Sequence, residues 1–287
     1  MVNPKLMKVE KRIAELDSGQ IHYSRAGCGR PLLLLHGLLG GSFCWRRNMQ
    51  ALAQRHTVFA LDLPGHGEND APRYLDFSMP AQVDRVSSFL KLLNLEEVDI
   101  MGCSWGGAIA MLFAAQSAKV RSLVLVAPVN PWSQLGTGRI RFLNGRLGSA
   151  FLRAVWPISH PLYRIALARM YGDPSRLSAG TVEGYRSQVM RPGRVNNILS
   201  TLRGWEKDVN ALRSAIPKIK ARSLLIWGAR DGAVDVRSAE PLSRALPQGE
   251  LAVIQGAGHL PFEETPEEFN RLVLEFINRK VPAGSGI

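Results

Sequence analysis

The sequence predicts an α/β protein, with a mostly parallel sheet flanked by helices and an inserted helical cap. Short apolar runs alternate along the chain with stretches of helical spacing, and repeated strand–helix units of this kind form parallel sheets covered on both faces. One stretch, 130–210, breaks the alternation, because it has helical spacing in pieces and no convincing strand. We therefore divide the 287 residues into a core of 1–129 and 211–287 and a helical cap (lid) of 130–210.

Apolar runs predict five strands before the cap and two after it. Each run ends near a Gly, Pro or Ser, where the chain turns. The runs are GQIHYSRAG (19–27), PLLLLHG (31–37), HTVFALDLPG (56–65), EVDIMGCS (97–104), RSLVLVAPV (121–129), RSLLIWGARD (222–231) and ELAVIQGAGH (250–259).

Helical spacing fills most of the gaps between these runs. Helices are expected at 43–54, 78–94, 105–117 and 239–247, and the cap adds helical pieces at 142–156 and 161–171. Ser78 is expected to cap the second of these helices. The last helix opens with TPEE (265–268), a capping box with Pro at the first helical position.

Composition and cysteine usage predict a cytoplasmic protein. Apolar residues make up 46% of the chain and charged residues 21%, which is ordinary for a globular domain. Cys28, Cys44 and Cys103 show no CxxC spacing, which argues against a disulfide framework and a structural zinc site. The first residues lack the apolar stretch of a signal peptide, and no apolar run approaches the ~18 residues of a membrane span. We expect no cofactor, no metal and no transmembrane segment; a homo-oligomer is compatible with the sequence.

Positive charge is concentrated in the predicted cap. The chain carries a formal net charge of +12. Between Trp132 and Trp205 lie eleven arginines and only two acids, Asp173 and Glu183, which gives this stretch a net charge of +9. Three interpretations stay open: a solvated helical surface, attraction of an anionic substrate, or docking on an anionic surface. No RRM, zinc-finger or basic-zipper signature accompanies the arginines, so nucleic acid is not an expected partner.

The stretch IMGCSWGGAIA (100–110) places Ser104 where a predicted strand meets a predicted helix. A side chain at such a sharp turn projects from the carboxyl edge of the sheet, and flanking glycines are needed because larger residues would collide with neighbouring backbone. The free N–H groups at the helix start favour a developing oxyanion. Ser104 is therefore a candidate nucleophile.

A serine nucleophile needs a base and an acid that orients the base. His259 lies directly after the last predicted strand and Asp231 after the strand before it, so all three side chains are expected at one edge of the sheet. The chain order Ser104, Asp231, His259 is the one that accompanies this strand–turn–helix motif. Asp235 is a rival acid, but we expect it to start the next helix as a cap.

These motifs resemble those of the α/β-hydrolase fold superfamily, and the chain is similar to its serine esterase-like members with a helical cap. The similar blocks are LLLLHGLLGG, LDLPGHGEND, GCSWGG, LLIWGARD and GAGHLPFEETPEEF. The resemblance implies a cap between the strands at 121–129 and 222–231, and an oxyanion hole formed by the backbone N–H groups of Trp105 and Leu38. Some family members carry the acid after the strand before the cap, but here that loop reads APVNPWS, which has no acid.

Other candidate residues are expected to be structural. His36 lies in the oxyanion loop and His66 in a Pro-Gly turn, and Cys103 should be a buried, inert thiol. Trp105 is expected both to pack at the helix start and to form part of the pocket floor. Most cap aromatics are expected in the cap core, with a few facing substrate: Trp132, Phe142, Phe151, Trp156, Tyr163 and Tyr171.

These residues predict a serine hydrolase that cleaves small-molecule carboxylic esters of short to medium acyl chain, including anionic ones if the cap arginines attract them. Ser104 would form an acyl-enzyme, with His259 moving the proton and Asp231 holding the imidazole. One alternative is carbon–carbon bond hydrolysis of a meta-cleavage product, although Leu260 and Pro261 follow the histidine where many such enzymes carry Trp. Another is a low-turnover ligand-binding member of the fold.

Overall fold

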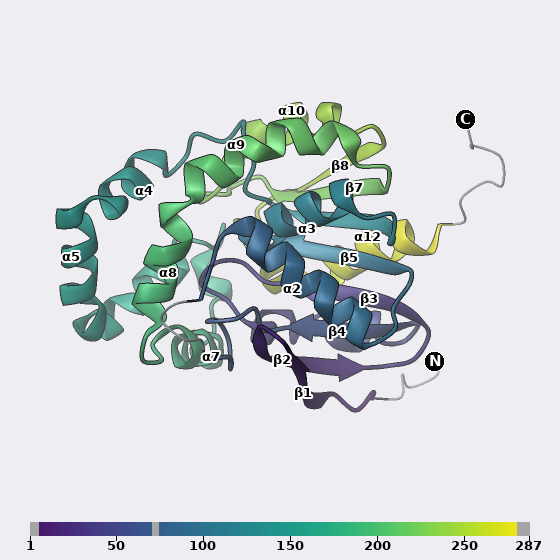
Figure 1. Ribbon diagram of the computed structural model, residues 1–287, viewed down its shortest axis with the longest axis horizontal. Helices are drawn as coiled ribbons and strands as arrows, with labels where there is room; N and C mark the ends of the chain where they lie inside the picture. Colours follow the sequence, from purple (N-terminus) through teal and green to yellow (C-terminus); the bar gives the residue numbers. More distant parts are fainter. Residues whose placement is uncertain (1–5, 71–74, 280–287) are drawn as a thin grey trace.

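A computed structural model describes residues 6–70 and 75–279, and an eight-stranded sheet lies at its centre (Figure 1). The strand order is β1-β2-β4-β3-β5-β6-β7-β8, and all pairings are parallel except those of β1 with β2 and of β2 with β4. The strands are β1 (Glu10–Leu16), β2 (Gly19–Ala26), β3 (Arg30–Leu35), β4 (His56–Leu61), β5 (Val98–Cys103), β6 (Val120–Val126), β7 (Arg222–Gly228) and β8 (Gly249–Ile254). The predicted fold class is confirmed. Residues 1–5 belong to the N-terminal stretch in which no signal peptide is expected, and they lie outside the described residues.

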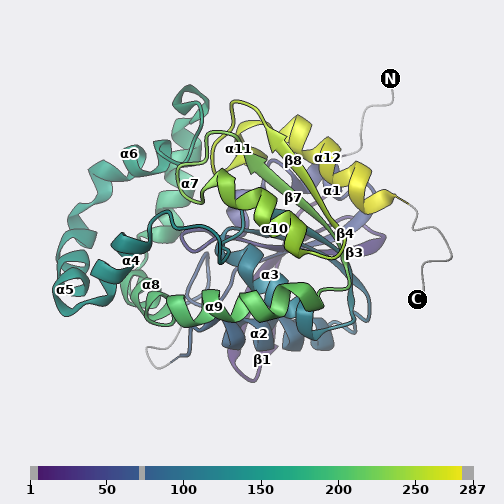
Figure 2. The ribbon, with the colours of Figure 1, turned by 90° about the horizontal axis from the view of Figure 1, so that it is seen from above.

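Helices cover both faces of the sheet (Figure 2). One face packs against α2 (Met79–Leu92), α3 (Trp105–Gln116) and α10 (Ala239–Ala245), and the other against α1 (Met49–Leu52) and α12 (Pro266–Asn278). Strands β4 and β5 are buried along their whole length. Double-sided burial explains why these strands are continuous apolar runs in the sequence.

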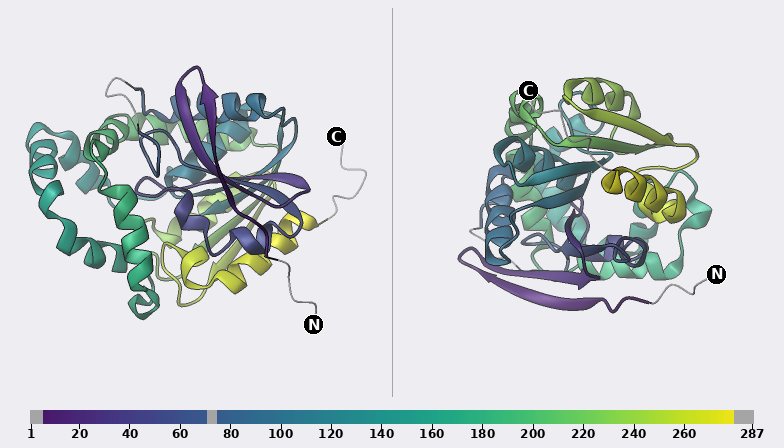
Figure 3. Two further views of the ribbon diagram at one scale, coloured as in Figure 1. Left: turned by 90° about the horizontal axis from the view of Figure 1, so that it is seen from below. Right: turned by 90° about the vertical axis from the view of Figure 1, so that its right-hand side faces the viewer.

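Strand β1 was not expected from the sequence. It pairs with β2 from Glu10 opposite Arg25 to Leu16 opposite Gly19, and this hairpin (purple) forms one end of the sheet (Figure 3). Within EKRIAEL only Ala14 is buried. An edge strand with so little buried surface carries almost no apolar alternation, so its signal in the sequence is weak.

The helix expected at 43–54 is confirmed only in part, because the chain forms two short pieces there, η1 (Ser42–Trp45) and α1, instead of one continuous helix. Asn48, between them, turns its side-chain amide inward and donates hydrogen bonds to the Phe262 carbonyl at 3.2 Å and to Asn270 Oδ1 at 2.9 Å. These tertiary contacts override helix propensity, which is a weak preference.

The capping expectations have mixed outcomes. Ser78 caps α2 as predicted, because its hydroxyl accepts a hydrogen bond from the Ala81 N–H at 3.4 Å. The capping box at 265–268 does not form. Helix α12 begins at Pro266 as predicted, but the Thr265 hydroxyl donates to the Pro261 carbonyl at 3.1 Å instead of accepting from the new helix. The short helix α11 (Pro261–Glu264) ends directly before Thr265, and the hydroxyl bonds to a carbonyl of this preceding helix.

Between β6 and β7 the described chain forms helices and no strand. We call its first half, residues 137–168, the outer arm; it comprises α4 (Thr137–Asn144), α5 (Arg146–Val155), η2 (Trp156–Ile158), η3 (His160–Leu162) and α6 (Tyr163–Ala168). After η4 (Pro174–Arg176) come α7 (Ala179–Val189), α8 (Arg194–Arg203) and α9 (Trp205–Ala215), which we call the anchored half. Helix α9 continues beyond residue 210, where the predicted cap ends, and η5 (Ile216–Lys218) leads into β7.

Buried hydrogen bonds tie α8 and α9 to the core. The Arg194 guanidinium donates to the carbonyl of Asn69 at 2.5 Å and to that of Gly67 at 2.6 Å. The Asp208 carboxylate accepts from the Met79 N–H, at the start of α2, at 2.8 Å. These contacts fix the anchored half against the sheet.

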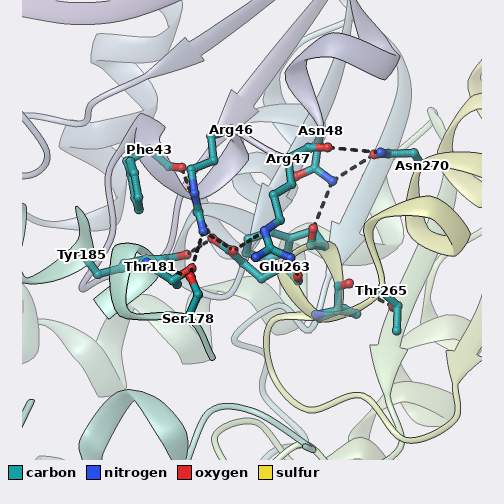
Figure 4. Close-up of polar contacts among 12 residues, drawn as sticks. Phe43, Arg46, Arg47, Asn48, Ser178, Thr181, Tyr185, Glu263, Thr265 and Asn270 are labelled. Atoms are coloured by element: carbon teal, nitrogen blue, oxygen red, sulfur yellow. Dashed lines mark hydrogen bonds and ion pairs between the residues drawn. The ribbon is translucent and has the colours of Figure 1, made fainter. Parts of the chain in front are cut away.

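A second tie joins α7 to the core through a buried carboxylate (Figure 4). Glu263 of α11 accepts from both terminal nitrogens of Arg46 and from the Tyr185 hydroxyl at 3.0 Å. The same guanidinium donates to Thr181 Oγ1 at 2.7 Å. A bidentate Arg–carboxylate pair with further partners is geometrically demanding, so it fixes the position of α7.

Candidate active site

Ser104 lies at a strained turn between β5 and α3. Its φ is +53° and its ψ is −117°, an uncommon conformation for a residue with a side chain. The backbone is fixed on both sides, since the Ser104 N–H donates to Val126 O at 2.9 Å and the Ser104 carbonyl accepts from the Val129 N–H at 3.0 Å. A Cβ on Gly106 would collide with the carbonyl oxygen of Leu35, so the turn requires glycine there. Local strain of this kind is typical of a nucleophile elbow.

Asp231 and His259 are joined by a hydrogen bond of 2.8 Å between Oδ2 and Nδ1. The Asp231 side chain is fully buried, and its Oδ1 accepts from the N–H groups of Ala233 at 2.7 Å and Val234 at 3.0 Å. The carboxylate is therefore held by three donors. In the neutral imidazole a proton on Nδ1 leaves Nε2 as the acceptor.

Asp235, the rival acid, has a different role. It caps η6 (Val236–Ser238), accepting from the Arg237 N–H at 3.0 Å, and it pairs with the Arg237 guanidinium at 2.7 Å. The hydrogen bonds and positive charge of Arg237 lower the pKa of Asp235 below its ordinary value. The predicted capping role of Asp235 is confirmed.

Ser104 and His259 line one cavity of about 740 Å³ at the carboxyl edge of the sheet. Among the described residues no hydrogen bond joins Ser104 Oγ to the His259 ring, and such contacts commonly tighten only when substrate binds. The cavity wall is mainly apolar and includes inward side chains of the outer arm: Ile140, Leu143, Leu152, Trp156, Tyr163 and Leu167. Apolar lining with a few polar groups is typical of a small-molecule site.

Two backbone donors accompany Ser104. Within the described chain, neither the N–H of Leu38 nor that of Trp105 donates a hydrogen bond. Leu38 lines the cavity, and Trp105 is the first residue of α3, where an N–H has no helical partner. Neither N–H group therefore has a hydrogen-bond partner within the described chain.

Two buried histidines support the loop that carries Leu38. His36 Nδ1 lies 2.7 Å from the Gly37 carbonyl, and His36 Nε2 accepts from the Leu63 N–H at 3.0 Å. Burial lowers the pKa of His36 to about 4 and that of the neighbouring His66 to about 3. A neutral imidazole that donates at Nδ1 and accepts at Nε2 fits the contacts of His36. His66 is buried in the adjacent turn, with Nδ1 3.1 Å from the Pro64 carbonyl, so both histidines have the structural setting expected of them.

Glu264 holds the loop of His259, and the sequence analysis missed it. Its Oε1 accepts from the Gly258 N–H at 2.7 Å, and its Oε2 accepts from the N–H groups of Gly172 at 2.9 Å and Asp173 at 3.1 Å. The His259 N–H also donates to the Met170 carbonyl at 2.7 Å. No spacing rule marks a carboxylate that joins Gly258, six residues before it, to Gly172 and Asp173, which lie 92 and 91 residues away in sequence.

The aromatic residues of the cap divide differently from the expectation. Trp156 and Tyr163 line the cavity, and the buried Trp156 Nε1 has no hydrogen-bond partner among the described residues. Phe142 and Phe151 are 54% and 57% exposed, so placing them in a cap core is wrong. Tyr171 is buried, as expected. The helices of the outer arm are one layer thick, so only one face of each can point inward.

Trp105 does not line the cavity, so its expected place in the pocket floor is wrong. Its ring stacks on that of Trp205 at 4.8 Å, and Trp205 is the residue that reaches the cavity. Cys103 is buried, and its burial raises the pKa of the thiol above the ordinary range. A buried thiol of raised pKa is a poor nucleophile, which agrees with the inert role expected.

The described residues hold no group of three or more His, Cys, Asp or Glu side chains that could ligate a metal ion. In the same part of the chain, every helix is too short or too polar to cross a membrane.

Comparison with known proteins places these features in a family. A family model described as alpha/beta hydrolase fold matches residues 30–266. An uncharacterized protein of Mycobacterium tuberculosis is 32% identical over 271 residues, which cover 90% of this chain and 78% of the relative. A 2-hydroxy-6-oxononadienedioate/2-hydroxy-6-oxononatrienedioate hydrolase of Pseudomonas putida is 28% identical over 93% of this chain and 94% of its own length. A solved structure of a meta-cleavage product hydrolase from Pseudomonas fluorescens IP01 matches with a TM-score of 0.78 and 26% identity, over 96% of this chain and 99% of that one.

Proposed function

Since the chain belongs to the α/β-hydrolase fold family and has relatives that are hydrolases, we propose that it is a serine hydrolase of carboxylic esters with short to medium acyl chains. The observation that carries the proposal is the hydrogen bond between Asp231 and His259 beside a cavity that Ser104 also lines. A base oriented by a buried acid is what a serine needs to become a nucleophile at neutral pH.

In the proposed reaction, Ser104 Oγ attacks the ester carbonyl carbon while His259 Nε2 takes the hydroxyl proton. Asp231 keeps the imidazole in the productive tautomer and stabilises the imidazolium. The N–H groups of Leu38 and Trp105 stabilise the oxyanion. The carbonyl re-forms, His259 gives the proton to the leaving alcohol, and an acyl-enzyme remains. Water then attacks that acyl-enzyme by the same steps, which regenerates the serine.

The proposal assigns residues 130–210 to a cap over a core of 1–129 and 211–287. The apolar cavity wall supports an acyl group as the main bound part of the substrate. The volume of the cavity supports acyl chains of short to medium length. The unpartnered Trp156 Nε1 is a donor for a polar atom of the substrate.

The test is hydrolysis of p-nitrophenyl esters over a series of acyl lengths. Ser104→Ala should lower kcat by about 10⁴–10⁶-fold, because the members of such a unit act together. Ser214→Ala is the matched control, since it removes an exposed hydroxyl of α9 that does not line the cavity and should leave kcat within a few-fold. Wild-type turnover in Ser104→Ala would overturn the proposal.

A second candidate function is hydrolysis of a carbon–carbon bond in a vinylogous diketo acid. The likeness to the Pseudomonas putida hydrolase over nearly the full length of both chains favours it. Leu260 and Pro261 after His259 count against it, and we rank it second. Turnover of a meta-cleavage product without turnover of esters would establish it, whereas tight binding of esters with no turnover of either would support a ligand-binding protein.

A further inference from the structure

The outer arm exposes more large apolar side chains than any other part of the described structure. Leu147 is 83% exposed and Ile158 74%, and the set also includes Phe142, Phe151, Leu162 and Ile165. Single exposed apolar residues are ordinary, but a run of six on consecutive helices indicates a contact surface. Figure 2 shows α4, α5 and α6 together along one edge of the molecule, away from the sheet.

None of these six residues lines the cavity. The same helices line the cavity with other side chains, such as Ile140 of α4, Leu152 of α5 and Tyr163 of α6. The outer arm is therefore apolar on two sides, one toward the cavity and one toward solvent. Several large apolar side chains exposed together normally mark a contact surface, so the outward face lacks a partner.

The charged residues of the outer arm indicate the chemistry of that partner. Residues 137–168 contain five arginines and no Asp or Glu. Arg141 pairs with Glu206 and Arg153 bonds Asn196, but Arg146 and Arg164 form no ion pair among the described residues. Exposed apolar side chains and exposed, unpaired arginines on the same arm match a surface that has anionic groups outside and hydrocarbon beneath.

We propose that the outward face of the outer arm docks on lipid bilayers that contain anionic lipids. The apolar side chains enter the boundary between headgroups and acyl chains, while Arg146 and Arg164 contact lipid phosphates. A second copy of the chain fits less well, because a two-fold contact through this face brings the same arginines together with no acid on the arm to offset them. Nucleic acid would leave the apolar side chains in water.

The test is flotation of the full-length protein with vesicles. We expect binding to mixed phosphatidylcholine–phosphatidylglycerol vesicles and little binding to pure phosphatidylcholine. A Leu147→Ser/Ile158→Ser/Leu162→Ser variant should lower the partition coefficient by about 10-fold or more, through lost insertion. Arg146→Gln/Arg164→Gln should lower it by about 10-fold and weaken its salt dependence. The charge variant also keeps the test valid if the apolar variant misfolds.

Matched controls come from exposed residues far from the arm. Ile13→Ser/Leu92→Ser removes apolar side chains from β1 and α2, and Arg55→Gln removes a charge; both should bind as the wild type does. The proposal is overturned if the wild type does not bind anionic vesicles, or if the arm variants and the control variants bind these vesicles equally well. A wild-type dimer that the apolar variant converts to a monomer, with no vesicle binding, would assign the face to a second copy. The binding readout does not depend on ester hydrolysis, so the two proposals can fail separately.

Discussion

The two halves of the helical segment between β6 and β7 differ in how they are held. The anchored half sends side chains into the core, where Arg194 and Asp208 make buried hydrogen bonds to core backbone. Among the described residues, the outer arm makes its long-range side-chain hydrogen bonds to the anchored half or to Met190 directly after α7, as from Arg141 to Glu206 and Asn144 to Leu202. Within the described chain its one other side-chain bond beyond the arm is local, from Thr137 to the Gln134 carbonyl. The anchored half is thus fixed to the core, and the outer arm is attached to the anchored half.

Similar composition can therefore hide different roles. Both halves are rich in arginine and apolar residues, and helical spacing alone does not separate them. Where an arginine is buried and donates to backbone it fixes structure, and where it is exposed and unpaired it is free for a partner. Exposure and partners therefore distinguish the halves.

The largest expected difference is between Arg194 and Arg164. Arg194→Ala should lower the free energy of unfolding by roughly 3 kcal/mol or more, because two buried carbonyls lose their donor. Arg164→Ala should change it by less than about 0.5 kcal/mol. Urea unfolding of both variants checks this, and equal losses would mean that the two halves are held alike.

A matched leucine pair tests packing in the same way. Leu199 of α8 is 2% exposed, and Leu199→Ala should cost about 2–4 kcal/mol of unfolding free energy through the cavity it leaves. Leu147→Ala on the arm should cost less than about 0.5 kcal/mol. If Leu147→Ala costs as much, its side chain is buried in solution and the arm is not free.

Acid should act on the core loop that contains His36, which neither half of the helical segment provides. The folded-state pKa of His36, about 4, lies below its ordinary value, so the unfolded chain binds a proton that the folded chain does not between pH 6.5 and 4. The stabilisation is complete above about pH 6.5 and falls as the pH drops. From pH 7 to pH 5 His36 alone should remove roughly 2 kcal/mol of unfolding free energy.

His66, with a folded-state pKa of about 3, acts in the same direction. Unfolding measured across this range in the wild type and in His66→Gln separates the two contributions, and the variant should show a shallower slope. A wild type equally stable at pH 7 and pH 5 would mean that the loop histidines are not held neutral.

The smallest effect concerns the junction between arm and core. Glu264→Gln keeps only one acceptor oxygen for three N–H donors, so the loop of His259 should lose its fixed position. We expect kcat to fall by about 10-fold with KM nearly unchanged, as for a residue that positions the base. Glu267→Gln, exposed on α12, should leave both constants as they are. A Glu264 variant that lowers stability but not kcat would remove the positioning role.

Much of the fold could be predicted, because parallel strands buried on both faces are unmistakable in sequences such as LLLL at 32–35. The contact between Asp231 and His259 could be predicted for a related reason, since each residue lies in the loop that follows a strand, β7 or β8. Glu264 and the outward direction of Phe142 and Phe151 could not. Both depend on how segments distant in sequence lie in space, which helical spacing alone does not reveal.

The backbone conformation of Ser104 implies a trade-off between the stability of the fold and the reactivity of the side chain. A backbone with φ of +53° is unstrained only for glycine. Ser104→Gly should therefore remove strain of about 1–3 kcal/mol, and the net gain in unfolding free energy is this amount minus the conformational entropy that glycine adds to the unfolded chain. Under the proposed mechanism the same change deletes the nucleophile. Mutational drift without selection for turnover would therefore favour glycine at position 104, and a serine retained there would be a mark of selection for chemistry.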